Sequence, residues 1–407
     1  MHEKLAINGG KPVRKKPFPM RKPYGKQEIN EVISALKSQC LFRYGGNKVL
    51  KLEKRFAQLY KVKYAVASTS GTAALHIAIG ALNPDPGDEI ITSPVTDLGT
   101  IIGILYQNAI PVFADIDPET YNIDPADVER KITKRTKAII PVHLFGNPCD
   151  MDKIMEIARK HQLFVIEDCC QAYFTPYKGK FVGTIGDIGC FSMQQSKHLT
   201  TGDGGITITN NKDFAKRMSF FADKGWARTG FGPRAYLFLA PNYRMNELTG
   251  AVALAQLKKT KLVVEKRRFL GDLLTEKIKD IKGICPAAVT PGAKHSYWTY
   301  PLRILDYDPV KFNNALNAEG IPCHVGYIGK PIFLCAESLW NKKTYGNSHC
   351  PFDCQKYGKE IQYKQGDCPV TEKMLPRLIT IPIHENFSEK DIEDISKAIR
   401  KVAENLL

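Results

Sequence analysis

The feature that most constrains the fold of this chain is an alternation of short β-prone runs with helical patterns. The strand-like runs occupy residues 64–68, 88–92, 110–116, 138–143 and 163–168, and the helical patterns occupy residues 71–82, 98–107 and 149–161. Strands that alternate with helices are typical of βαβ units. The alternation therefore predicts an α/β fold, with a mostly parallel central sheet and helices on both of its faces.

The C-terminal part of the chain has a different pattern. A long helical stretch covers residues 246–281 and connects to a mixed region. This region holds strand-like runs at 297–305 and 378–384 and helical runs at 309–320 and 388–406. The mixture predicts a smaller α+β domain.

These patterns predict that the chain is divided into an arm and two domains. We expect an N-terminal arm over residues 1–30 that packs on the small domain, a large domain over residues 31–255, and a small C-terminal domain over residues 256–407. Prolines punctuate residues 329–370, and no regular element is predicted there.

The charge of the chain allows two interpretations. Its 407 residues carry a formal net charge of +16, which is compatible with a DNA-binding regulator. The basic residues are dispersed, however, and no nucleic-acid-binding motif accompanies them. Attraction of anionic small molecules explains the charge as well, so we expect no nucleic-acid partner.

The sequence also bears on location and on metal binding. No apolar run reaches the roughly 18 residues that cross a bilayer, and the basic start has no apolar core typical of a secretory signal. We therefore expect a cytoplasmic protein without a membrane partner, whose 11 cysteines are free thiols. A looser cluster of His349, Cys350, Cys354 and Cys368 lacks the second ligand pair of a zinc site, so no metal is predicted.

Three features follow the predicted strands, at the sheet edge where ligands of parallel sheets bind. The residues 69–72 open a helix, whose N–H groups favour a phosphate, although a simple N-cap explains them alone. Asp168 ends a buried strand and needs a cationic partner, either a protonated pyridine or a nearby Arg or Lys. Lys197 lies on a loop beyond Ser192 and is able to form a Schiff base, although an isolated lysine is usually solvated.

The order of these features favours one cofactor. An anion cradle, a counter-charge for a ring nitrogen and an amine for an aldehyde are what pyridoxal phosphate requires. The sequence thus predicts a pyridoxal phosphate enzyme, with Asp168 keeping the ring nitrogen protonated and Lys197 moving a proton.

Four blocks of the sequence resemble the DegT/StrS-type sugar aminotransferases, which belong to fold type I of the pyridoxal phosphate enzymes. The blocks are "SGTAALHIAI", "VIEDCCQA", "FSMQQSKHLTTGDGG" and "PNYRMNELTGAVALAQL". The resemblance extends over nearly the whole chain. It implies transfer of an amino group from glutamate or glutamine to a ketone or aldehyde of a sugar-like acceptor, through an internal aldimine and pyridoxamine phosphate.

The resemblance also implies roles for individual residues and a homodimer with shared active sites. Lys197 carries the aldimine, Asp168 contacts the pyridine nitrogen, and Gln171 lies near the ring or its 3′-oxygen. The phosphate is held by Gly71, Thr72 and Ser192, with Asn242 reaching it from the partner subunit.

The sequence departs from the family pattern at one position and leaves the acceptor open. Asp97 stands where many relatives carry an aromatic residue that stacks on the cofactor, so either Leu98 or another residue packs the ring, or the loop runs differently. A subgroup of the family has histidine in place of the lysine and dehydrates sugars. Lys197, with His198 beside it, favours transamination over that alternative. Acceptors in the family include keto-cyclitols, nucleotide-linked keto-hexoses and related sugars.

Overall fold

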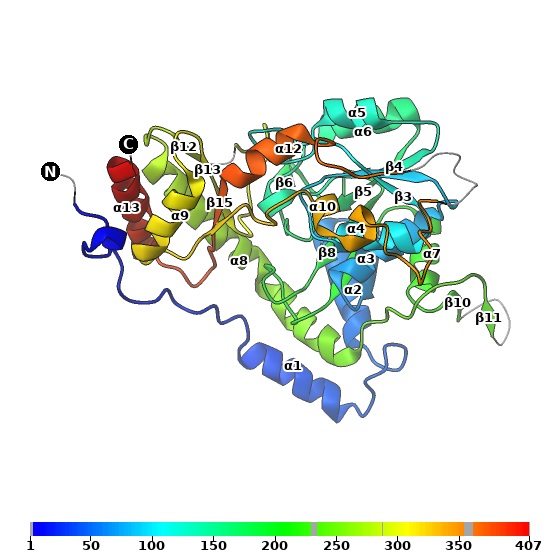
Figure 1. Cartoon of the computed structure of the whole chain (residues 1–407). Helices are drawn as coiled ribbons and strands as arrows, with labels where there is room; N and C mark the ends of the chain where they lie inside the picture. The colour runs from blue at the N-terminus through cyan, green and yellow to red at the C-terminus, as the bar shows by residue number, and fades with distance from the viewer. Residues whose placement is uncertain (1–2, 229–233, 287, 354–360, 407) are drawn as a thin grey trace.

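The computed structural model describes residues 3–228, 234–286, 288–353 and 361–406. A seven-stranded sheet in the order β1-β9-β8-β5-β4-β2-β3 forms the centre of its larger part (Figure 1). The strands are β1 (Tyr64–Ser68), β2 (Glu89–Thr92), β3 (Ile110–Phe113), β4 (Thr136–Ile140), β5 (Phe164–Asp168), β8 (Ile188–Ser192) and β9 (Gly205–Thr209). From β3 to β8 all neighbours are parallel, and β9 is antiparallel to both β8 and β1. The predicted mostly parallel sheet is confirmed.

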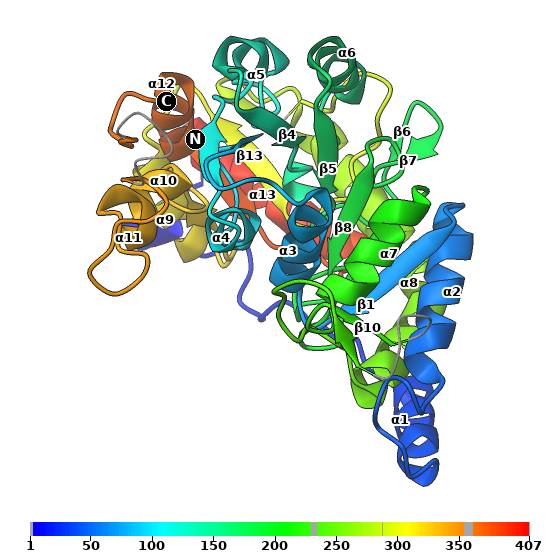
Figure 2. The ribbon, with the colours of Figure 1, turned by 90° about the vertical axis from the view of Figure 1, so that its right-hand side faces the viewer.

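Helices cover both faces of this sheet (Figure 2). One face carries α3 (Gly71–Leu82), α4 (Gly99–Tyr106) and α7 (Lys212–Phe221); the other carries α2 (Lys48–Tyr60), α5 (Pro125–Lys131), α6 (Met151–His161) and the start of α8 (Glu247–Ile278). Successive strand side chains alternate between the faces, as Ile139 and Ile140 do. Both faces are apolar, which is why the strands read as continuous hydrophobic runs in the sequence.

A second, four-stranded sheet forms the smaller part in the order β12-β13-β15-β14. Its strands are β12 (Ile284–Pro286), β13 (Tyr300–Ile304), β15 (Leu378–Ile381) and β14 (His324–Val325), all antiparallel, and α9 (Pro309–Ala318) and α13 (Glu389–Leu406) pack on them. Leu5, just before the short helix η1 (Ala6–Asn8), is buried in this core, and Arg14 forms an ion pair with Asp391 of α13.

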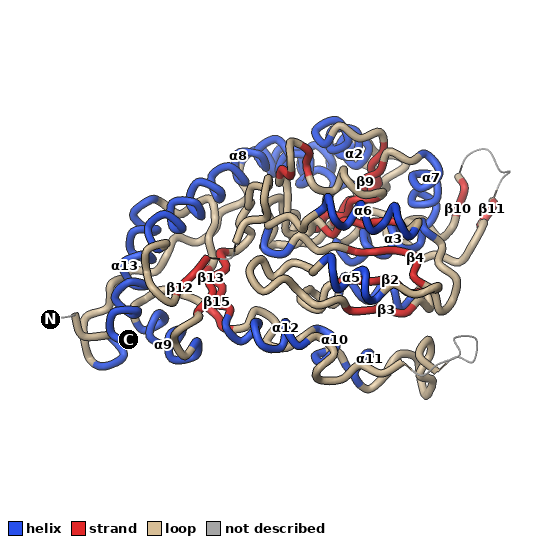
Figure 3. Tube along the Cα trace, turned by 90° about the horizontal axis from the view of Figure 1, so that it is seen from above, coloured by secondary structure: helices blue, strands red, loops and turns tan. Residues whose placement is uncertain are grey.

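The helix α8 connects the two parts (Figure 3). Its 32 residues contact α1 (Lys26–Lys37) and α2 at one end and α13 at the other. The Asn246 side chain accepts a hydrogen bond from the Thr249 N–H and so caps the helix start. We propose that the large domain ends near residue 255, within this helix, and that residues 1–30 form an arm.

The described parts of residues 329–370, namely 329–353 and 361–370, lie along the edge strand β3 (Figure 3). Within the described part of this segment, the Tyr363 hydroxyl donates to the Pro111 carbonyl at 2.7 Å, and the N–H groups of Val370 and Thr371 each donate to Asp115 at 2.8 Å. These contacts cover β3, an edge that otherwise presents unpaired backbone groups.

The remaining elements are short. They are η2 (Leu144–Gly146), β6 (Pro176–Tyr177), β7 (Lys180–Phe181), β10 (Trp226–Ala227), β11 (Ala235–Tyr236), α10 (Ile332–Cys335), α11 (Glu337–Trp340), α12 (Pro369–Met374) and η4 (Leu375–Arg377). Thus residues 329–370, where no regular element was expected, contain short helices. The predicted helices and strands agree with the structure to within three residues at each end, whereas α1, α2, α7, β9, β12, β14 and these short elements were not predicted. In the described ranges, the helices all lack a stretch long and apolar enough to span a bilayer.

Candidate active site

A cavity of about 340 Å³ opens at the carboxyl ends of the parallel strands. Six residues that the sequence singled out line it together, namely Gly71, Thr72, Asp168, Gln171, Ser192 and Lys197. They come from the start of α3, the end of β5 and the loop after β8. The parallel arrangement explains this meeting, because loops that follow neighbouring strands emerge at the same sheet edge.

The start of α3 forms one wall of the cavity. The Ser70 side chain is the N-cap and accepts the Ala73 N–H at 3.0 Å, so the N-cap interpretation is correct for Ser70. The first-turn N–H groups of Gly71 and Thr72 have no acceptor within the helix and face the same site. A Cβ atom on Gly71 would lie 2.5 Å from the Ser192 Cβ, so only glycine lets α3 approach β8 this closely. The N-cap and an anion site therefore coexist here.

Asp168 lines the cavity and is 4% exposed. Its Oδ1 accepts the Cys170 N–H at 3.0 Å and its Oδ2 accepts the Thr100 hydroxyl at 2.8 Å. Thr100 is held in turn by the Thr96 hydroxyl at 2.7 Å. Within the described ranges Asp168 forms no ion pair with Lys or Arg. A buried carboxylate in this setting is stabilised by a cationic ligand.

Lys197 points its amine into the same cavity. Its Nζ lies 3.8 Å from the centre of the Trp298 ring. Burial lowers the pKa of Lys197 below its ordinary value, and the nearby thiol of Cys170 and carboxylates of Asp168 and Asp97 only partly offset this. A lysine with a lowered pKa has a larger neutral, nucleophilic fraction at neutral pH.

Gln171 bridges the two parts of the chain. Its Oε1 accepts the Phe145 N–H at 2.6 Å, and its Nε2 donates to the Tyr327 hydroxyl at 3.1 Å. Tyr327 and Trp298 also line the cavity, and sequence reasoning missed both. They belong to the small C-terminal part and follow no strand of the large sheet, so no local pattern marked them.

The structure shows which side chains line the cavity near Asp97, the position where many relatives carry an aromatic residue. Asp97 lines the cavity just before α4, and its Oδ1 accepts the Gly99 N–H at 2.8 Å. Leu98 packs instead into the apolar cluster beneath α10 and α11. The aromatic rings at the cavity are those of Trp298 and Tyr327, so the suggestion that Leu98 faces the cavity is not supported.

Asn242 and His198 lie away from the cavity of this chain. Asn242 is exposed, and its Oδ1 accepts the Arg244 N–H at 3.4 Å. Its predicted role across a subunit boundary stays a prediction. His198 is buried, and its Nε2 donates to the Ser296 carbonyl at 2.9 Å. It does not line the cavity that Lys197 lines.

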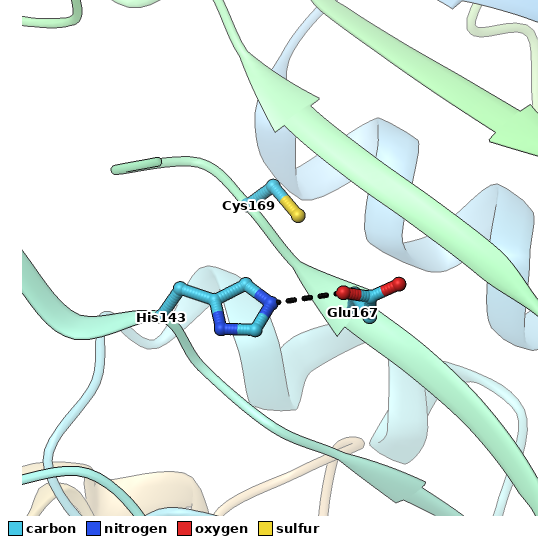
Figure 4. A group of neighbouring side chains, drawn as sticks. All are labelled: His143, Glu167 and Cys169. Atoms are coloured by element: carbon cyan, nitrogen blue, oxygen red, sulfur yellow. Dashed lines mark hydrogen bonds and ion pairs between the residues drawn. The ribbon is translucent and has the colours of Figure 1, made fainter. Parts of the chain in front are cut away.

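A group of potential metal ligands lies behind the site: His143, Glu167 and Cys169 (Figure 4). His143 Nδ1 accepts the Cys149 N–H at 3.0 Å, so its Nε2 carries the proton and donates to Glu167 at 3.1 Å. Glu167 also accepts three backbone N–H groups, at 2.7 to 2.8 Å. These bonds occupy the lone pairs of His143 and Glu167 that a cation would need, so we interpret the group as a structural hydrogen-bond network.

The other candidate cluster does not assemble among the described residues. Cys354 lies outside them. Cys368 is buried with its Sγ 3.9 Å from the Phe113 carbonyl, and His349 Nδ1 lies 3.2 Å from the Lys342 carbonyl. Among the described residues, His349, Cys350 and Cys368 do not gather into a group of potential metal ligands.

The sequence of the chain is similar to those of known aminotransferases. The sequence model of the DegT/DnrJ/EryC1/StrS aminotransferase family matches residues 23–400. The chain is 36% identical over 396 residues to an uncharacterised protein of Methanocaldococcus jannaschii, covering 94% of this chain and 97% of that protein. It is 33% identical over 419 residues to the L-glutamine:2-deoxy-scyllo-inosose aminotransferase of Streptoalloteichus tenebrarius, covering 98% and 97% of the two chains.

A solved structure agrees with these sequence matches. An aminotransferase from Psychrobacter cryohalolentis superposes with a TM-score of 0.82 at 29% identity, covering 97% of this chain and 100% of that chain. The family resemblance and the fold that it implied are confirmed.

Proposed function

Since the chain belongs to the DegT/DnrJ/EryC1/StrS aminotransferase family and is an aminotransferase, we propose that it uses pyridoxal phosphate to aminate a sugar-like acceptor. One observation carries the proposal. Asp168, buried without an ion-pair partner among the described residues, shares a cavity with the amine of Lys197 and the N-terminus of α3.

The residues present fit this cofactor. The N–H groups of Gly71 and Thr72 and the hydroxyl of Ser192 suit a phosphate, because the start of a helix stabilises negative charge. When bound, pyridoxal phosphate supplies an aldehyde that takes up amino groups and a ring that accepts electrons. The carboxylate of Asp168 suits the ring nitrogen, since Thr100 and Cys170 orient it by hydrogen bonds.

Lys197 and Gln171 complete the proposed machinery. Lys197 is the covalent anchor and, once released, the base that carries a proton, for which its lowered pKa is suited. Gln171 is held at both ends of its amide, and this fixed side chain supports its proposed role near the ring or its 3′-oxygen.

The acceptor and the donor are proposed from the relatives. The Streptoalloteichus tenebrarius relative is named for glutamine and a keto-cyclitol, which supports glutamine as donor and a keto-cyclitol as acceptor. Glutamate and nucleotide-linked keto-hexoses are the next candidates. Lys197 stands where the dehydrating subgroup carries histidine, and it lines the cavity, which favours amination over sugar dehydration.

A homodimer with shared sites is part of the proposal. Exposed apolar side chains on α1 and the loop after it, among them Ile29, Ile33, Leu36 and Phe42, support burial against a second copy. Asn242 then reaches the phosphate in the partner's cavity. We also place the enzyme in the cytoplasm, since the buried cysteines Cys149, Cys169 and Cys190 are free thiols.

Mixing two inactive variants tests the shared site. Lys197→Ala removes the amine from the cavity of its own subunit. Asn242→Ala removes the proposed phosphate contact from the cavity of the partner subunit. After subunit exchange in a 1:1 mixture, about half of the dimers are mixed, and each mixed dimer has one complete site out of two. We therefore expect about a quarter of the activity of the wild type. A mixture as inactive as each variant alone would contradict sharing.

The reaction is tested by incubating the full-length protein with cofactor, glutamine or glutamate, and a panel of keto-cyclitols and nucleotide-linked keto-hexoses. We expect mass spectrometry to find an amine on the acceptor, and none with Lys197→Ala. Loss of water from the acceptor without amination would instead identify a dehydratase.

A further inference from the structure

The segment that carries the lysine is held by residues far away in the sequence. We define residues 194–198 as the lysine loop. The Trp298 Nε1–H donates to the carbonyl of Ser196 at 3.1 Å and to its hydroxyl at 3.2 Å. Arg21 donates to the carbonyls of Gln195 and His198 at 2.8 and 3.2 Å. Bonds from outside thus fix the backbone on both sides of Lys197.

The face of Trp298 also contacts the lysine amine. The Lys197 Nζ lies 3.8 Å from the ring centre, well inside the distance at which a cation and an indole attract each other. Within the described ranges, Lys197 forms no ion pair. The indole face is in contact with the ammonium. Burial lowers the pKa of this amine, the charges of Cys170, Asp168 and Asp97 raise it, and that of Arg267 lowers it.

Trp298 is itself fixed by a buried ionic network. Arg267, 1% exposed, donates to the Trp298 carbonyl at 3.2 Å and to Glu385 at 2.9 Å. Glu385 also pairs with Arg21 at 2.8 Å. The network joins α8, the segment after β15 and the N-terminal arm to the lysine loop. Movement of Trp298 would break several of these bonds together.

We propose that Trp298 is the positioning residue of Lys197: its N–H group fixes the lysine loop, and its ring face holds the ammonium at the cavity. The proposal rests on the proposed function for the role of Lys197, but its test does not require the cofactor. An indole face favours the charged form of the amine, so Trp298 opposes the effect of burial on Lys197.

Three variants separate the two parts of this role. Trp298→Phe keeps a ring face and removes the N–H, Trp298→Leu removes both, and Trp340→Phe is the control because Trp340 is 46% exposed on α11. The pKa of Lys197 is measured in the full-length, cofactor-free protein by competitive acylation, with the labelled peptide quantified by mass spectrometry. Amide hydrogen exchange of residues 194–198 is measured on the same samples.

We expect Trp298→Leu to lower the pKa of Lys197 by about one unit, which is the shift that loss of a desolvated cation–π contact produces. We expect Trp298→Phe to lower it by less than half as much, yet to speed exchange in the lysine loop as Trp298→Leu does. Trp340→Phe should change neither.

Two results would overturn the proposal. One is a Lys197 pKa in Trp298→Leu equal to that of the wild type; the other is unchanged exchange of the lysine loop in Trp298→Phe. If Trp298→Leu does not fold, exchange in Trp298→Phe decides. A protein that fails to bind cofactor at Lys197 but shows these shifts would refute the proposed function and leave this positioning role intact.

Discussion

Glu385→Gln should destabilise the protein in a pH-dependent way, because Glu385 is the shared carboxylate between two arginines. Burial raises its pKa, but Arg267 and Arg21 outweigh burial and hold the pKa at about 2, against 4.5 for the free group. The shift corresponds to about 3 kcal/mol of stability. Because the folded-state pKa is lowered, this contribution is present above pH 4.5 and is lost as the pH falls towards 2.

Urea unfolding of the wild type and Glu385→Gln at several pH values measures this contribution. At pH 7 we expect the variant to be less stable by about 3 kcal/mol, and about 2 kcal/mol of that difference to disappear between pH 7 and pH 3. The matched control is Glu276→Gln on α8, whose ion pair with Lys279 is exposed. It should cost less than about 1 kcal/mol. A difference for Glu385→Gln that stays constant from pH 7 to pH 3 would refute the reasoning.

Three further predictions concern the cavity and its surroundings. Asp168→Asn should weaken cofactor binding by about tenfold to a hundredfold, as loss of a charged hydrogen bond does, whereas Asp97→Asn should leave cofactor binding unchanged. A spectroscopic titration measures both affinities, and equal losses in the two variants would contradict the role of Asp168. Gly71→Ala places a Cβ 2.5 Å from Ser192, so thermal unfolding should show a loss of about 1–3 kcal/mol, and an unchanged Tm would show that the contact is easily relaxed. Chelator or added zinc should leave the Tm unchanged, because hydrogen bonds already occupy the group around His143; a higher Tm with zinc would reveal a metal site.

The sequence predicted the part of the site that follows from one topological rule. Lys197, Asp168 and Gly71 each follow a strand of one parallel sheet, and the carboxyl ends of such strands meet. The strands were found from apolar patterns because helices cover both faces of the sheet, so that the strands are continuous hydrophobic runs. The antiparallel strand β9 and the helix α7 were not predicted, because they follow the last of the alternating strand and helix patterns that the sequence shows.

The rest of the site depends on contacts between distant segments. Arg21 lies 174 positions before the Gln195 carbonyl to which it donates, and Trp298 lies 102 positions after Ser196. No local spacing marks such pairs, because the small C-terminal part and the arm must first fold against the large sheet. Asp97 was a visible departure in the sequence, but only the structure shows that Trp298 and Tyr327 are the aromatic residues at the cavity.

The central claim is that Lys197 is the covalent anchor of pyridoxal phosphate, and one measurement tests it directly. The full-length protein is incubated with the cofactor, reduced with borohydride and digested, and the peptides are mapped by mass spectrometry. We expect the cofactor-derived mass on Lys197, and its absence in Lys197→Ala. An unmodified Lys197, or a label that spreads over exposed lysines while Lys197 stays free, would contradict the account.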